Sequence, residues 1–260
     1  INEKKTTPYY HAKSRPAYSE SAAVASMIPI IEATEAPTIF VHMTTSEVRE
    51  YIAAAKKKLP VFTEFCPHYL TLSEEVYERA DSQNFVCSPP MRSKEDQNGL
   101  WKMIADGLCD IVSSDHSSYD TKQKKLHKDF FPRIPNGLPG IETRGLVMFS
   151  EGVAKGRMTE NQFAALLSTN NAKLMGMYPE KGVIQPGSDA DIVIFDPSRK
   201  YTLRSKDLHM ATDYTPFENF TIQGKPVHTI VRGNMVIENE KYTNTKTKGE
   251  FIKRHAPNLV

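Results

Sequence analysis

The sequence predicts an α/β fold with a parallel sheet, followed by a smaller β-rich part. Over the first 150 residues, short apolar runs rich in β-branched or aromatic residues alternate with longer helical patterns, an order typical of a parallel sheet. Beyond residue 180, turns and strand-like runs replace the helical segments. We therefore expect one domain over residues 1–180 and a mostly β domain over residues 181–260.

The first two expected strands are each followed by a helical segment. PTIFVH, at 37–42, has the composition of a buried strand and precedes the helical pattern TSEVREYIAAAKKK at 45–58. Ser46, with its acidic neighbours, marks the start of this helix. PVFTEF, at 60–65, is the second strand, and SEEVYERA, at 73–80, is the next helix.

A third helix and a third strand continue the same order. The helix is expected over 94–107 and carries the only tryptophan, Trp101. CDIVSSDH, at 109–116, is the third clear strand, and FAALLSTNNAKLMGM, at 163–177, has a helical pattern.

The C-terminal part has the pattern of strands and turns. GVIQPGSDADIVIFDP, at 182–197, contains a Pro-Gly turn and a strand, and VHTIVRGNMVIENEKY, at 227–242, predicts a hairpin about Gly233 and Asn234. The tail after Tyr242 is rich in Thr and Lys, so we expect a loosely ordered surface strand or arm.

Composition argues for a small-molecule partner. The chain has 260 residues, 39% of them hydrophobic, and 33 basic against 31 acidic residues leave a formal net charge of +2. This balance gives no electrostatic argument for nucleic acid or an anionic membrane. No apolar run approaches the roughly 20 residues of a membrane helix. Three cysteines at spacings that match neither a zinc knuckle nor a disulfide framework suit a reducing cytoplasm, where we expect buried thiols.

Polar residues of catalytic type lie at the ends of the three strands. His42 follows the first strand, Glu64 lies within the second, and Asp115 with His116 follows the third. Ligands bind at the carboxyl ends of parallel strands, so the repetition favours a shared site. Imidazole and carboxylate are ligands for a catalytic divalent metal, which typically takes three protein ligands, so at least one more must come from elsewhere in this chain or from another chain.

Two further histidines near these ends are expected to have structural roles. Neighbouring residues of a strand face opposite sides, so Asp115 and His116 cannot both enter one cavity from regular β geometry. We favour Asp115, with His116 packing behind it or lying in the loop. His68, in FCPHYL, is expected to cap or to pack against aromatic rings.

Two loops rich in proline and glycine can present main-chain amides to a planar ligand. They are CSPPMR, at 87–92, and IPNGLPGIE, at 134–142, although each is also readily explained as a simple turn. The basic run KQKKLHK, at 122–128, is expected to be a solvated loop face and not a phosphate site.

Together, these segments resemble the dihydropyrimidinases and D-hydantoinases, which are cyclic amidases of the amidohydrolase superfamily. The resemblance runs from YHAKSRP, at 10–16, to about Arg254. It is carried, in order, by FVHMTTSEV, EFCPHYLTL, CSPPMRSKEDQNGLW, VSSDHSSY, IPNGLPGIETR, FSEGVAKGRMTENQF, KLMGMYPEKGVIQPGSDADIVIFDP and DYTPFENFTIQGKPVHTIVRG.

The resemblance implies the C-terminal part of a distorted (β/α)₈ TIM-type barrel plus a β-sandwich built from both chain termini. It implies two divalent metal ions, usually zinc, with a carboxylated lysine among their ligands. His42 matches a ligand of one metal, and Asp115 matches a ligand of the other metal and the general acid/base. Ser88 and Asn136 match positions that bind the amide or imide atoms of the ring, largely through the main chain. The implied reaction is hydrolysis of a dihydropyrimidine or a 5-substituted hydantoin to an N-carbamoyl amino acid, by a homotetramer.

Several family features have no counterpart in this sequence. They are the HxH pair of the first barrel strand, the metal-bridging lysine and a ligand histidine upstream of YHAKSRP; His11 matches a position that is not a ligand in the family. We therefore expect a fragment that begins after the fifth barrel strand. If these 260 residues are the whole protein, we expect no hydrolysis and poor solubility, because sheet edges and apolar faces would be exposed.

Two other functions remain open. One is a non-catalytic scaffold related to the hydantoinases, as in the collapsin-response-mediator group, although the presence of both His42 and Asp115 argues against it. The other is an allantoinase or dihydroorotase, although IPNGLPGIETR looks more like the hydantoinase form of that loop.

Overall fold

The computed structural model describes residues 3–257 and divides the chain into two compact units. Unit 1 comprises Ile1–Arg144 with Leu203–Phe220, and unit 2 comprises Gly145–Thr202 with Thr221–Val260. Unit 1 combines helices with a parallel sheet and unit 2 combines helices with an antiparallel one, so the predicted α/β class is confirmed. None of the helices in the described part of the chain is long and apolar enough to cross a membrane.

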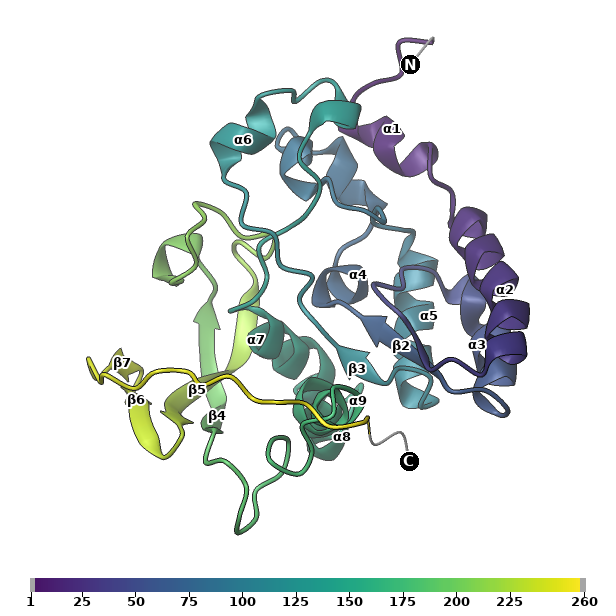
Figure 1. The fold of residues 1–260 in the computed structure, drawn as a ribbon. Coiled ribbons are helices and arrows are strands. Elements are labelled where there is room, and N and C mark those ends of the chain that lie inside the picture. Colours follow the sequence, from purple (N-terminus) through teal and green to yellow (C-terminus); the bar gives the residue numbers. More distant parts are fainter. Residues whose placement is uncertain (1–2, 258–260) are drawn as a thin grey trace. The chain divides into compact units, whose positions relative to one another are not determined.

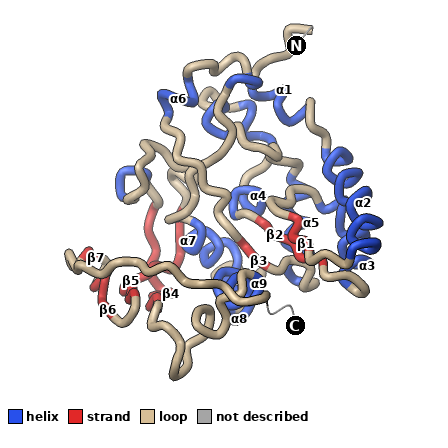
Figure 2. Tube along the Cα trace, viewed as in Figure 1, coloured by secondary structure: helices blue, strands red, loops and turns tan. Residues whose placement is uncertain are grey.

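The sheet of unit 1 has the three predicted strands in parallel order (Figures 1 and 2). They are β1 (Thr38–Phe40), β2 (Val61–Phe65) and β3 (Ile111–Val112). Both strand pairs, β1 with β2 and β2 with β3, are parallel. The third strand is shorter than the expected 109–116, because the chain leaves the ladder after Val112 and enters the turn that carries Asp115. All three carboxyl ends therefore lie at one edge of the sheet.

Two predicted helices of unit 1 are confirmed and one is wrong. The expected helix at 45–58 is a 3₁₀ turn, Ser46–Val48, continued by α3 (Arg49–Lys56), and the one at 94–107 is α5 (Lys94–Ala105). Side chains cap both: the Thr45 hydroxyl accepts from the Glu47 amide, and Ser93 accepts from the Asp96 amide. At 73–80 the chain forms only a 3₁₀ helix, Glu74–Glu78. The segment is tied to the loop at Met91, whose amide donates to the Tyr77 hydroxyl at 3.0 Å.

Unit 1 has, within its described residues, four further α-helices. They are α1 (Pro8–Lys13), α2 (Ala17–Thr34), α4 (Pro67–Thr71) and α6 (Thr121–Lys125). The core between helices and sheet is apolar: Phe65, Leu100 and Val112 are fully buried. Trp101 is also buried, and its indole N–H donates to the Leu70 carbonyl at 2.8 Å, so α5 is held against α4.

Unit 2 begins with short helices. They are α7 (Arg144–Met148), which starts at the last residue of unit 1, then α8 (Glu160–Ala164) and α9 (Asn170–Leu174), with π-helical turns at Phe149–Val153 and Ala165–Thr169. The run from Glu160 to Leu174 corresponds to the helix expected at 163–177.

The sheet of unit 2 is an antiparallel meander in chain order. Its strands are β4 (Ile192–Thr202), β5 (Thr221–Val231), β6 (Asn234–Glu238) and β7 (Lys241–Tyr242). The predicted hairpin is confirmed, because Val231 pairs with Asn234 across a two-residue turn whose residues, Arg232 and Gly233, both have positive φ. The tail after β7 has no strand over the described residues, but the His255 amide donates to the Gly176 carbonyl at 2.8 Å.

Candidate active site

The strand-end residues His42 and Asp115 share an unusual backbone conformation. His42 lies two residues beyond β1 and Asp115 three residues beyond β3, and each has φ of 42°. Residues other than glycine rarely adopt this left-handed region. Strain of this kind persists only where the surroundings enforce it, and it is concentrated at functional sites.

The carboxylate of Glu64, at the end of β2, links the two turns. One oxygen, Oε2, accepts the His42 amide at 2.9 Å, and the other accepts the Ser113 hydroxyl. The Ser113 oxygen in turn accepts the Asp115 amide at 3.4 Å. Glu64 is buried, with 6% of its surface exposed. A single buried carboxylate thus holds the chain on either side of it and sets where His42 and Asp115 lie.

Burial and hydrogen bonding act in opposite directions on the pKa of Glu64, and the net effect raises it. Burial raises the pKa of its carboxyl, the His42 amide that donates to it lowers the pKa, and the Asp115 charge raises it again. Asp115 itself is exposed and His42 is half-buried. The two residues with metal-binding side chains are therefore open to a ligand, while the residue that connects them is enclosed.

The donor chemistry suits a divalent metal, although the number of donors does not complete a site. Imidazole and carboxylate are ordinary ligands of catalytic zinc. Among residues 3–257, however, no three His, Cys, Asp or Glu side chains are grouped so as to hold a metal ion. His42 and Asp115 thus fit a metal centre in kind, and further ligands must come from outside this set.

The other two histidines have the structural roles expected of them. His116 leaves the site, since its Nδ1 accepts the Gly140 amide at 3.1 Å. His68 is buried and its ring packs 4.1 Å from that of Tyr69. Its Nε2 has no hydrogen-bond partner among residues 3–257, and burial, followed by the effect of His42, lowers the pKa of His68 to about 3.

The two proline- and glycine-rich loops meet beside the strand ends. The Ser88 hydroxyl donates to Oδ1 of Asn136 at 2.8 Å, and the Gly137 amide donates to the Val86 carbonyl at 3.1 Å. Ser88 and Asn136 are both exposed. Gly137 has φ of 129°, and a Cβ there would lie 2.2 Å from the Ser117 hydroxyl oxygen, so only glycine fits.

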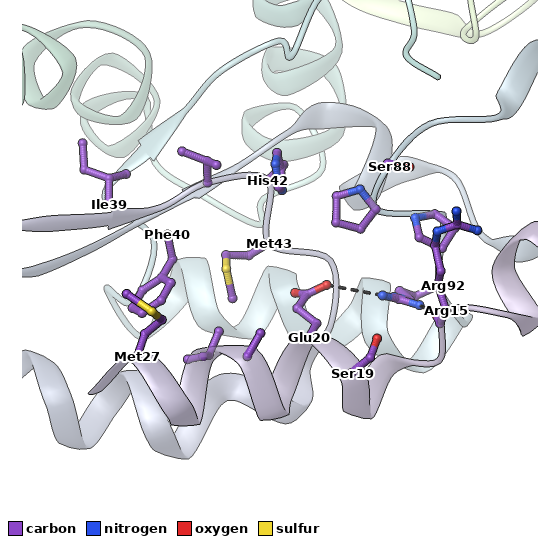
Figure 3. A pocket seen from close by; sticks show the side chains of 15 residues that line it. Arg15, Ser19, Glu20, Met27, Ile39, Phe40, His42, Met43, Ser88 and Arg92 are labelled. Carbon is purple, nitrogen blue, oxygen red and sulfur yellow. Dashed lines mark hydrogen bonds and ion pairs between the residues drawn. The ribbon is translucent and has the colours of Figure 1, made fainter. Parts of the chain in front are cut away.

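A cavity of about 610 Å³ lies between α2, β1 and the loop that follows Cys87 (Figure 3). This volume is in the range of small-molecule sites. His42 and Ser88 line it, whereas Asp115 and Asn136 do not. Its polar end is an ion pair between Arg92 and Glu20 at 3.4 Å, drawn as the dashed line in Figure 3. The cavity therefore brings together two of the four predicted site residues.

Sequence reasoning missed the roles of three residues. Glu64 stood out as a polar strand-end residue, but nothing in the sequence indicated that it bridges two turns. The basic run at 122–128 was expected to be solvated, and this is wrong for Lys124, which has 0% of its surface exposed. His11 is buried as well, and its Nε2 lies 2.6 Å from the Cys87 carbonyl. The three cysteines are free and buried, as expected.

Comparison with known proteins places these observations in a family. The model of the "Amidohydrolase family" matches residues 11–236. D-phenylhydantoinase from Escherichia coli O127:H6 (strain E2348/69 / EPEC) is 40% identical over 252 residues, which are 96% of this chain and 55% of the relative. The chain thus spans about half the length of the curated relatives it matches.

Solved structures agree with the sequence match. Dihydropyrimidinase from Brevibacillus agri NCHU1002 is 39% identical with a TM-score of 0.91, covering 93% of this chain and 53% of that one. D-hydantoinase (dihydropyrimidinase) from Thermus sp. is 35% identical with a TM-score of 0.95, covering 99% of this chain and 57% of that one.

Proposed function

Because the chain belongs to the amidohydrolase family, we propose that it carries active-site residues of a metal-dependent cyclic amide hydrolase. The substrate is a dihydropyrimidine or a 5-substituted hydantoin, and the product is an N-carbamoyl amino acid. The observation that best supports this proposal is the network around the buried carboxylate of Glu64, which accepts the His42 amide directly and reaches the Asp115 amide through the Ser113 hydroxyl. The names of the relatives, hydantoinases and dihydropyrimidinases, support the substrate class.

The fold proposed for the enzyme extends the observed sheets. The three parallel strands are the last strands of a (β/α)₈ barrel, whose catalytic residues lie at the carboxyl ends of its strands. Residues 1–180 belong to this barrel and residues 181–260 to a β-rich domain of sandwich type. The protein acts in the cytoplasm as a homotetramer.

The proposed metal centre contains two divalent ions, with zinc as the metal. His42 binds one ion and Asp115 the other, and the remaining ligands, a carboxylated lysine among them, lie outside this chain. When bound, the metals would supply Lewis acidity and would make hydroxide available at neutral pH.

The residues of this chain then have separate tasks. Asp115 takes a proton from the attacking water and delivers it to the leaving ring nitrogen, a double duty suited to a positioned carboxylate that solvent can reach. The main chain at Ser88 and Asn136 binds the amide or imide atoms of the ring and fixes its orientation. Their mutual hydrogen bond supports this assignment, because it sets the spacing of the two loops.

The test is a panel of substrates assayed with this chain and with the protein from the complete reading frame that encodes it. Dihydrouracil, hydantoin, 5-phenylhydantoin, allantoin and dihydroorotate are each incubated with zinc, and ring opening is followed by loss of ultraviolet absorbance. We expect turnover of the first three in the protein from the complete frame and none in the isolated chain. Turnover of only allantoin or dihydroorotate would replace the proposed substrate class, and no turnover at all would favour a scaffold protein.

A further inference from the structure

Lys124 is a buried cation with no acidic partner among the groups that shift its pKa. It lies in α6, which a reciprocal cap fixes: Asp120 accepts the Gln123 amide, and the Gln123 side chain accepts the Asp120 amide. In this short helix Lys124 is fully buried while Lys125 is exposed. Burial is the larger influence and lowers the pKa of Lys124, and the nearby Cys87 thiol has a smaller effect in the opposite direction. Burying a charge without a partner is unfavourable, so the position calls for an explanation.

The ammonium group of Lys124 joins the two loops described above. Its Nζ donates to the Val86 carbonyl at 2.8 Å and to the Pro135 carbonyl at 2.6 Å. It also lies 5.7 Å from the centre of the Tyr119 ring. Two carbonyls and an aromatic ring thus surround the ammonium group.

These carbonyls are close in sequence to the residues proposed to bind the ring. Val86 precedes Ser88 by two residues, and Pro135 directly precedes Asn136. The Val86 carbonyl also accepts the Gly137 amide, at 3.1 Å. The loops are therefore connected on their buried side by Lys124 and at the exposed surface by the Ser88–Asn136 hydrogen bond.

We propose that Lys124 is a positioning residue that sets the spacing of the Ser88 and Asn136 loops for the ring of the substrate. The proposal rests on the proposed function, because it takes these loops as the ring-binding elements. The buried ammonium group suits this task, because it donates to one main-chain carbonyl in each loop. Lys124 does not touch the ring.

The test compares Lys124→Met, which has a similar length and no donor, with Lys124→Arg, which keeps the donors. Lys125→Met is the matched control, because it removes the exposed neighbouring charge from the same helix. Hydrogen exchange is measured on peptides covering residues 84–92 and 133–141, with peptides from β2 and α5 as references. Steady-state kinetics with hydantoin are measured on the protein from the complete reading frame.

We expect Lys124→Met to speed exchange by about tenfold in both loop peptides and to leave β2 and α5 unchanged. The KM for hydantoin should rise by about tenfold, with a much smaller change in kcat, because ground state and transition state both lose a preformed site. Lys124→Arg should recover part of the KM, and Lys125→Met should match the wild type.

Unchanged exchange in the two loop peptides of Lys124→Met would overturn the proposal, because it would mean that Lys124 does not hold the loops together. Exchange that is equally faster in β2 and α5 would also overturn it, because it would indicate a general structural role. Loosened loops with an unchanged KM would overturn the link to substrate. If the wild type turns over no cyclic amide, the proposed function fails and so does the ring-binding role. The exchange data would still decide whether Lys124 joins the loops.

Discussion

Acid should destabilise this protein through His11. The imidazole is buried, its Nε2 is bonded to the Cys87 carbonyl, and its Nδ1 lies 3.2 Å from the Arg15 guanidinium. Burial, together with the charges of Arg15, Lys124 and Arg92, lowers the pKa of His11 to about 4. Because the folded-state pKa lies below the unfolded value of 6.5, the stability is fully present above pH 6.5 and is lost as the pH falls towards 4.

The magnitude follows from this difference in pKa. At pH 5 the unfolded chain binds nearly one more proton at His11 than the folded chain does. Integrated from neutral pH, this difference removes about 2 kcal/mol from the free energy of unfolding. Below pH 4 the loss approaches about 3 kcal/mol. A loss of 2 kcal/mol is a large part of the stability of an ordinary domain.

The assay is urea unfolding at pH 7.5 and pH 5, on the wild type and on His11→Gln. Glutamine keeps an N–H that can donate to the Cys87 carbonyl but does not titrate. Between the two pH values, the wild type should lose about 2 kcal/mol more than His11→Gln. His255→Gln is the control, since the His255 side chain is 70% exposed, and it should behave as the wild type does. Equal losses in the wild type and His11→Gln would refute the reasoning, because they would mean that His11 accepts a proton in the folded state.

Three further predictions concern the same loops and strand ends. Burial lowers the pKa of Lys124 to about 8. Between pH 7 and pH 10 the free energy of unfolding of the wild type should therefore rise by about 2 kcal/mol relative to that of Lys124→Met. The same pH dependence in urea unfolding of both proteins would contradict this. Gly137→Ala should destabilise by about 2 kcal/mol because of its φ of 129° and the 2.2 Å approach to Ser117, whereas Gly249→Ala, in open space, should be neutral in the same titration. In the protein from the complete frame, Glu64→Leu should lower zinc affinity by about 10–100-fold in a chelator competition, because the His42 amide loses its acceptor. Glu64→Gln should retain most of the affinity. Equal zinc affinities in Glu64→Leu and the wild type would refute the bridging role.

The strands could be predicted because their signal is local. β-branched and aromatic runs between helical segments gave all three parallel strands, and the turn at Gly233 gave the hairpin of unit 2. The strand ends also indicated where His42 and Asp115 would lie, since parallel strands end at one edge. The sequence pattern did not indicate the 3₁₀ form of Glu74–Glu78. It did not indicate the length of β3 either, because the residue after this strand, Ser113, is bonded to Glu64, 49 residues away.

The residues behind the site could not be predicted for a similar reason. Lys124 belongs to a run of six polar or charged residues, 120–125, a pattern that predicts a solvated face. Its burial depends on the Val86 and Pro135 carbonyls, which are 38 and 11 residues away in the chain. The bridging role of Glu64 likewise depends on Ser113, 49 residues away.

The central claim is that His42 and Asp115 are ligands in the metal centre of a cyclic amide hydrolase. The most direct measurement is metal content and hydantoin hydrolysis together, on the protein from the complete reading frame, with the wild type beside Asp115→Asn. The account predicts two metal ions per chain with turnover in the wild type, and loss of turnover with reduced metal content in Asp115→Asn. Unchanged metal content and turnover in Asp115→Asn would contradict it.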